Sequence, residues 1–143
     1  MQLHGFSGPA VSRIVGVTCR QLDYWVRTEL VHPSVAEAQG SGTQRLFSRR
    51  DLIEVLLIRR LLDTGLLLQQ IRQGVIGLQG LSDEDLARST IAITGQGARV
   101  LDSPAGVLAI LEDGDGVSAV CLASICRELD KRLAALTYHE EPE

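Results

Sequence analysis

Apolar residues near the start of the chain recur at helical spacing on either side of a short break. Residues 9–15 are predicted to form a short helix with a proline at its start, where the missing N–H costs nothing. Gly16 breaks this helix, and Thr18 then stands where a helix N-cap belongs. The next helix has apolar residues at i, i+3 and i+4: Leu22, Trp25 and Val26. Two short helices joined by a tight turn containing glycine predict a helix-turn-helix.

The stretch after residue 30 is polar and rich in turn-forming residues at 32–34 and 39–43. Short segments beside these turns, including residues 45–47, are predicted to pair as a β-wing. Ser48 is predicted to cap the following helix, with Asp51 three residues later in a weak version of the capping box.

A longer amphipathic helix is predicted over residues 49–64, and Gly65 ends it at the position that favours a left-handed backbone. A fourth helix is predicted from about residue 68 to residue 75. Three glycines thin out the apolar pattern there: Gly74, Gly77 and Gly80. Residues 82–85 indicate a helix start or a linker. The predicted organisation is a first domain at 1–76, a linker at 77–85 and a second domain at 86–143.

The second domain changes from helical to alternating periodicity. Ser103 is predicted to cap a helix with Pro104 at its first position. The predicted order is strand 90–94, strand 99–101, helix 103–111, turn 113–116, strand 117–122 and helix 124–136. The predicted fold class is therefore mainly α, with an N-terminal winged helix-turn-helix followed by a small α+β domain of order β-β-α-β-α.

Charge is distributed unevenly along the chain, whose net charge is −4. Residues 1–73 contain nine arginines and six carboxylates, whereas residues 74–143 contain five lysines and arginines and twelve carboxylates. A basic N-terminal half and an acidic C-terminal half are typical of a DNA-binding domain attached to a module that contacts a partner or a ligand. We see no signal peptide and no apolar run of membrane-spanning length, so we expect a soluble, cytoplasmic protein with no membrane partner.

The chemistry-bearing residues do not form a catalytic pattern. The three histidines, His4, His32 and His139, are far apart, and no nucleophile motif or glycine-rich phosphate loop is present. We therefore predict neither an enzyme nor a cofactor. Cys121 and Cys126 could supply two soft metal ligands, but we favour two small apolar residues in a packed helix, because no histidine or third cysteine stands near them in the sequence.

DNA recognition by a helix-turn-helix requires a second helix in the major groove and cations on the flanking phosphates. Arginine and glutamine can bond base edges bidentately, and a tyrosine hydroxyl can donate to a phosphate. The predicted DNA-binding residues come from the second helix, the wing and the third helix: Thr18, Arg20, Gln21, Tyr24, Arg27, Arg45, Arg49, Arg50 and Arg59.

Residues 8–71 resemble the MerR family of bacterial regulators. The family's Arg-x-Leu-Arg-Tyr-Tyr stretch appears as Arg-Gln-Leu-Asp-Tyr-Trp at residues 20–25. The wing corresponds to residues 44–48, the third helix to 51–61 and the fourth helix to 64–71. The matches follow one another in the family's order.

The resemblance implies roles for individual residues and partners for the protein. The residues are Thr18, Arg20 and Tyr24 in the major groove, Arg45 along the backbone from the wing, and Arg59 on a phosphate from the third helix. The implied partners are double-stranded promoter DNA, RNA polymerase and a second copy of the chain on a palindromic site. We expect the dimer contact to come from the fourth helix and the second domain, because glycines interrupt any long helix after residue 74.

Three departures from the family pattern narrow the assignment. Asp23 replaces an arginine, Trp25 replaces the second tyrosine, and Glu29 replaces a glycine. We expect Trp25 to pack inside the protein and Asp23 to face a nearby arginine of the chain. The sequences of residues 20–25 and of the wing resemble those of an actinobacterial FtsR-like subgroup, which is linked to cell-division genes.

Two alternatives to a simple DNA-binding regulator stay open. One is a protein-binding module on a MerR-like fold, which the acidic second half and Asp23 would suit. The other is a ligand- or metal-sensing MerR regulator. DNA affinity that falls steeply with salt would argue against the first alternative. A protein that neutralises phosphates releases counterions, and this release is less favourable at high salt.

Overall fold

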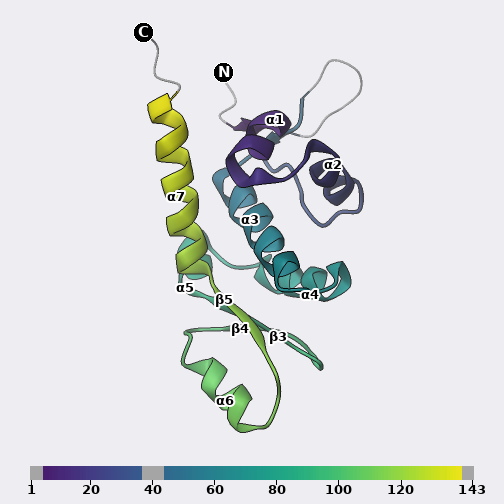
Figure 1. The fold of residues 1–143 in the computed structure, drawn as a ribbon, viewed down its shortest axis with the longest axis vertical. Coiled ribbons are helices and arrows are strands. Elements are labelled where there is room, and N and C mark those ends of the chain that lie inside the picture. The colour runs from purple at the N-terminus through teal and green to yellow at the C-terminus, as the bar shows by residue number, and fades with distance from the viewer. Residues whose placement is uncertain (1–4, 37–43, 140–143) are drawn as a thin grey trace. The chain divides into compact units, whose positions relative to one another are not determined.

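The structure is a computed structural model that describes residues 5–36 and 44–139. It forms two compact units, Met1–Leu56 with Glu128–Glu143, and Leu57–Arg127. Figure 1 labels the α-helices of both units and the strands of the second unit. Within the described ranges, none of the helices combines the length and the hydrophobicity of a membrane span.

The first unit contains the predicted helix-turn-helix. Helix α1 (Gly8–Val11) continues into the π-helical turn η1 (Ser12–Gly16), and helix α2 (Cys19–Arg27) follows after the turn at Gly16, whose φ is +85°. The unit also contains the first part of α3 (Arg49–Asp63) and the last part of α7 (Leu122–His139). Its buried apolar side chains include Val11, Val15, Leu22, Trp25, Leu30, Phe47 and Leu52.

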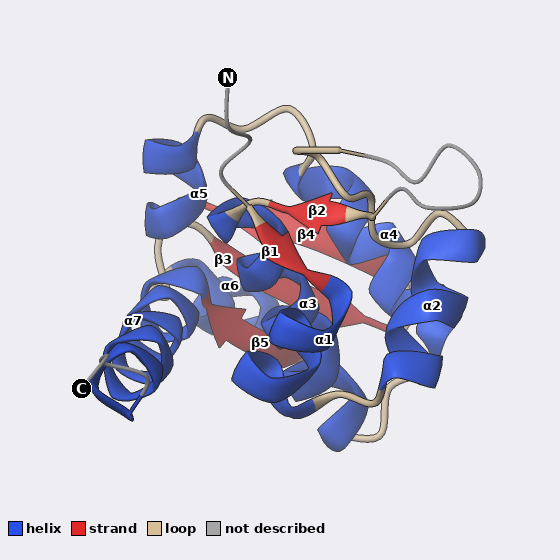
Figure 2. Cartoon of the chain, turned by 90° about the horizontal axis from the view of Figure 1, so that it is seen from above, coloured by secondary structure: helices blue, strands red, loops and turns tan. Residues whose placement is uncertain are grey.

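The first unit contains a two-stranded sheet, and the sequence predicted only one of its strands. Strand β2 (Leu46–Phe47) pairs antiparallel with β1 (Phe6–Ser7), and the two lie side by side in Figure 2. The strand at Phe6–Ser7 was missed, because two residues carry no periodicity. Leu46 also forms one antiparallel bridge with Ala36. The tip of the predicted wing, residues 37–43, lies outside the described residues.

The predicted start of α3 is confirmed, and its end lies one residue before the predicted residue 64. The Ser48 N–H donates to Asp51 Oδ2 over 2.8 Å, and the Asp51 N–H donates to Ser48 Oγ over 3.1 Å, so the capping box is reciprocal. The helix ends at Asp63, and Gly65 adopts a φ of +91°, which a residue with a Cβ reaches only at a cost.

The second unit is built on a three-stranded antiparallel sheet of order β4-β3-β5. The element order after α5 (Asp83–Arg88) is the predicted β-β-α-β-α, with the last helix being α7. The strands and the helix between them are β3 (Thr90–Thr94), β4 (Gly97–Leu101), α6 (Gly106–Glu112) and β5 (Ser118–Cys121). Helix α4 (Leu68–Leu78) packs against β3 and β4.

The predicted end of the fourth helix at residue 75 was wrong, because α4 continues through Gly74 and Gly77 to Leu78. A Cβ on Gly74 would lie 2.4 Å from Cδ1 of Ile91, and a Cβ on Gly77 would lie 3.1 Å from Cγ2 of Val100. The glycines therefore weaken the helix pattern while allowing α4 to approach the sheet closely. Close packing compensates for their low helix propensity, which a one-dimensional pattern cannot show.

The predicted start of the sixth helix was also wrong. Helix α6 begins at Gly106 rather than after a Ser103 cap, because the N–H of Gly106 bonds the carbonyl of Ser103 in an i to i+3 turn. Helix α7 begins two residues before the predicted residue 124 and extends to His139. Residues 77–85, the predicted linker, hold the end of α4 and the Ser82 cap of α5, and the predicted division into domains stays a prediction.

Substituting Gly74→Ala should destabilise the protein by about 1 kcal/mol, because the cost of overpacking Ile91 exceeds the gain in helix propensity. Thermal unfolding followed by circular dichroism measures this change. Gly80→Ala is the control, since its Cβ would have no described atom within 4 Å. A Gly74→Ala protein more stable than the parent would contradict the proposed close packing of helix and sheet.

Candidate nucleic-acid interface

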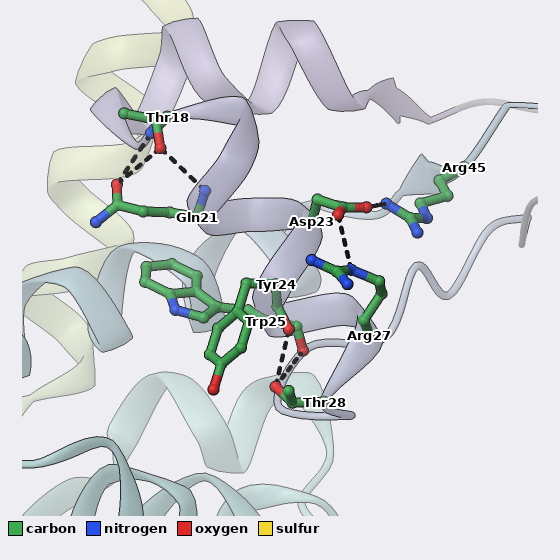
Figure 3. A network of polar contacts seen from close by, with 8 residues as sticks. All are labelled: Thr18, Gln21, Asp23, Tyr24, Trp25, Arg27, Thr28 and Arg45. Atoms are coloured by element: carbon green, nitrogen blue, oxygen red, sulfur yellow. Dashed lines mark hydrogen bonds and ion pairs between the residues drawn. The ribbon is translucent and has the colours of Figure 1, made fainter.

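Helix α2 presents one buried side and one exposed side. Leu22 and Trp25 are each 3% exposed, so this side of the helix is fixed inside the first unit, and the predicted packing role of Trp25 is confirmed. Arg20 and Gln21 are exposed, and Tyr24 is 49% exposed. Figure 3 shows Gln21, Tyr24 and Trp25 together with the polar network around Asp23.

The N-terminus of α2 is held by a reciprocal capping box between Thr18 and Gln21. Thr18 Oγ1 accepts from the Gln21 N–H over 2.9 Å, and Gln21 Oε1 accepts from the Thr18 N–H over 3.1 Å (Figure 3). Both oxygens that could recognise a base are thereby engaged. Bidentate bonding of Gln21 to an adenine uses Oε1 as well as the amide nitrogen, so the base would compete with this cap for Oε1.

The C-terminus of α2 is a Schellman motif with an unusual residue at its left-handed position. The Leu30 N–H bonds the Trp25 carbonyl over 2.9 Å, and the Glu29 N–H bonds the Val26 carbonyl over 3.1 Å. Glu29 has a φ of +64°, the only positive φ of a non-glycine residue within the described ranges. This geometry explains why glycine suits the position and why glutamate is strained there.

Asp23 joins two of the predicted DNA-binding arginines. Its Oδ2 accepts from Nε of Arg27 in the same helix, and its Oδ1 accepts from Nη1 of Arg45, which precedes β2; both distances are 2.8 Å (Figure 3). The hydrogen bond from Arg45, followed by the charge and hydrogen bond of Arg27, lowers the pKa of Asp23 despite some desolvation. The prediction that Asp23 faces an arginine of the chain is confirmed.

Arg20 differs from its neighbours because no hydrogen bond or ion pair to its side chain occurs within residues 5–36 and 44–139. It is exposed on α2, two positions before the buried Leu22. Its five N–H donors can therefore be offered to an incoming acceptor without breaking an internal bond. Of the predicted residues, Arg20 and Tyr24 are the ones best presented for an external contact.

Each predicted arginine of α3 interacts with other residues of the chain. Arg49 pairs with Asp130 of α7, with Nη2 2.9 Å from Oδ1. Arg50 and Arg59 have further interactions within the chain and are partly buried. Arg59 belongs to the second compact unit. The predicted set therefore divides into three arginines of α3 and six residues on or beside α2, which are Thr18, Arg20, Gln21, Tyr24, Arg27 and Arg45.

Two supporting contacts join residues far apart in the sequence, and they were missed. Asp51 Oδ2, besides the α3 cap, accepts from the N–H and the hydroxyl of Ser34 over 2.8 and 2.7 Å, which fixes the loop after α2. Arg132 of α7 donates to the carbonyls of Ile14 and Val15 at the end of the first helical segment. No local signal marks either contact, since the partners are separated by 17 and more than 100 positions.

Glu54 is a buried carboxyl in α3 with a strongly shifted pKa. Glu54 is 7% exposed. Burial and then the negative charge of Asp51 raise the pKa of Glu54 to about 7, while the positive charge of Arg50 opposes the shift. Glu54 is therefore protonated in the folded protein at mildly acidic pH.

The metal-sensing alternative gains no geometric support among residues 5–36 and 44–139, where no group of three potential metal ligands occurs. Cys121 Sγ instead accepts a hydrogen bond from the Thr90 hydroxyl over 3.7 Å. The second unit has a cavity of about 530 Å³ between the end of α4, α5 and β4. Asp85, Arg88 and Asp102 are among its lining residues, so its polar walls carry both signs of charge.

Comparisons with known proteins identify relatives of the first half and of most of the chain. Residues 6–74 match the model of the family described as MerR HTH family regulatory protein. Uncharacterized HTH-type transcriptional regulators of Mycobacterium bovis and of two Mycobacterium tuberculosis strains are each 41% identical over 128 residues. The aligned part is 90% of this chain but 57% of each relative, so the chain spans less than two thirds of their length.

Substituting Glu29→Gly should raise the free energy of unfolding by about 1 kcal/mol, because glycine adopts the left-handed conformation without the Cβ penalty. Denaturant unfolding measures the change. Glu29→Ala is the control, because alanine loses the same side chain but keeps the Cβ. Equal stability of the two variants would contradict strain at this position.

Substituting Glu54→Gln should flatten the dependence of stability on pH. The folded pKa of about 7 lies above the ordinary glutamate pKa of 4.5, so the folded state holds a proton that the unfolded state releases. The parent should therefore lose up to about 3 kcal/mol as pH rises from below 4.5 through 7, while the neutral glutamine loses none of it.

Unfolding measured at several pH values between these limits checks the effect of Glu54, with the exposed Glu112→Gln as the matched control. The Glu112 variant should keep the parent's pH profile. A Glu54→Gln protein with the parent's profile would contradict the raised pKa.

Proposed function

We propose that residues 6–74, which match the MerR HTH family model, form a MerR-family helix-turn-helix domain and that the protein is a sequence-specific, DNA-binding transcription regulator. The related HTH-type transcriptional regulators support the same function. Helix α2 acts as the recognition helix in the major groove of promoter DNA.

One observation carries this proposal: the exposed side of α2 presents Arg20 and Tyr24 while Leu22 and Trp25 hold the opposite side. A helix in the major groove needs polar side chains that reach outward from a backbone fixed in the protein. Arg20 can bond a guanine bidentately, and the Tyr24 hydroxyl can donate to a phosphate.

Arg45 extends the proposed interface beyond α2. Its bond to Asp23 holds it beside the recognition helix, so its guanidinium can follow the DNA backbone next to the groove. In our proposal residues 35–36 and 44–47 form the base of the wing of a winged helix-turn-helix. The pairing of Ala36 with Leu46 at its base supports this assignment.

The proposal includes a homodimer on a palindromic operator. One helix-turn-helix contacts too few base pairs for tight binding, and two copies related by a two-fold axis match two half-sites. RNA polymerase is the second proposed partner, in keeping with promoter binding. The resemblance of residues 20–25 to an FtsR-like subgroup supports cell-division genes as the regulated set.

The Arg20→Ala variant should bind promoter DNA about tenfold or more weakly than the parent, because a bidentate contact to a base contributes about 1–3 kcal/mol. The probe is a labelled duplex from the region upstream of the protein's own coding sequence, titrated at two salt concentrations. Parent affinity should fall steeply with salt, as expected when phosphates are neutralised.

Arg99→Ala is the matched control for this titration. Arg99 is an exposed arginine of β4 in the second unit, and it too has no bonded partner within the described residues. Both variants remove one positive charge, so an equal loss of affinity would reflect net charge alone and contradict a recognition role for Arg20. A parent that prefers neither this duplex nor any other over a scrambled one would contradict the proposed function.

A further inference from the structure

We propose that Asp23 is a specificity-determining residue, which acts as an internal counterion for Arg27 and Arg45 and limits binding to arbitrary DNA. This inference rests on the proposed DNA-binding function. It concerns the discrimination between an operator and other duplexes rather than the ability to bind DNA.

The geometry gives each oxygen of Asp23 its own arginine. Arg27 reaches Oδ2 from one helical turn away, and Arg45 reaches Oδ1 from 22 positions later in the chain, each over 2.8 Å. All three side chains lie around the exposed end of α2 in Figure 3. The Asp23 side chain is 44% exposed, so its charge stands at the surface that the proposed function turns toward DNA.

The carboxylate competes with the ligand that these arginines would otherwise bind. A phosphate oxygen and a carboxylate oxygen accept the same guanidinium hydrogen bonds. A randomly placed phosphate must either displace Asp23 or approach a negative charge. The lowered pKa keeps that charge present throughout the neutral range. Asp23 therefore weakens contacts that depend on charge alone.

Asp23 disfavours a correctly placed phosphate less than a randomly placed one. Arg27 gives Asp23 only its Nε–H and Arg45 only Nη1, and a guanidinium has five N–H donors in a fixed fork. The remaining donors are held in one orientation by the bond to Asp23. A phosphate that arrives where these donors point can share the arginine with the carboxylate, which favours an operator with matching backbone geometry over other sequences.

Removing the charge with Asp23→Asn tests this inference on a defined probe, a scrambled duplex of about three helical turns. At roughly 50 mM salt the variant should bind this duplex about tenfold more tightly than the parent. Its slope of log affinity against log salt should become steeper by about one to two, because two arginines gain phosphates. The ratio of affinity for the upstream fragment to affinity for the scrambled duplex should fall.

Asp85→Asn is the matched control, since Asp85 is an exposed aspartate with an arginine partner at 2.7 Å in the second unit. It removes the same charge and should leave binding and slope as in the parent. Asp23→Glu keeps the charge and should retain the parent's discrimination. Circular dichroism melts of each variant establish that the fold is intact.

Two results would overturn the inference while leaving the proposed function standing. The first is an Asp23→Asn protein that matches Asp85→Asn in affinity and salt slope. The second is an Asp23→Asn protein that binds both duplexes more weakly, which would make Asp23 a clamp that only supports Arg45. A parent without salt-dependent binding to any duplex would instead defeat the proposed function itself.

Discussion

Burial of Leu22 and Trp25 is the constraint on which the candidate interface depends. With both side chains 3% exposed, α2 can turn only its opposite side outward. Burying each contributes roughly 2–3 kcal/mol, a sizeable part of the stability of a small domain. The Thr18 cap and the Schellman motif at Glu29 then fix where the helix begins and ends. The direction of Arg20 and Tyr24 follows from these contacts.

Carboxylates decide which arginines are presented to a partner. Asp23 holds Arg27 and Arg45 next to α2, whereas Asp130 draws Arg49 toward α7. From the sequence alone, these arginines are equally good candidates for DNA contacts. The ion pairs separate Arg27 and Arg45, which are held beside α2, from Arg49, which is held at α7. The net charge of −4 is compatible with the proposed DNA binding, because residues 1–73 carry nine arginines and only six carboxylates.

Local signals allowed much of the fold to be predicted. Caps and turns at Thr18, Ser48 and Gly65 lie where their chemistry places them, and the alternation at residues 90–94 is the central strand β3. Predictions failed where a distant partner changed the outcome. Helix α4 continues through Gly74 because the glycine lets Ile91 pack closely. Strand β1 exists because β2 lies beside it, and its two residues carry no pattern of their own.

The sequence by itself determined where α2 and α3 begin, that Trp25 is buried, and that Asp23 faces an arginine. These features depend on interactions within one or two helical turns, which spacing along the chain encodes. Only the tertiary structure decided that Arg45 joins Arg27 on Asp23, that Asp51 bonds Ser34, and that Arg132 caps the carbonyls of Ile14 and Val15. Such pairs form when packing of the core brings distant segments together, and no periodicity in the sequence specifies which segments meet.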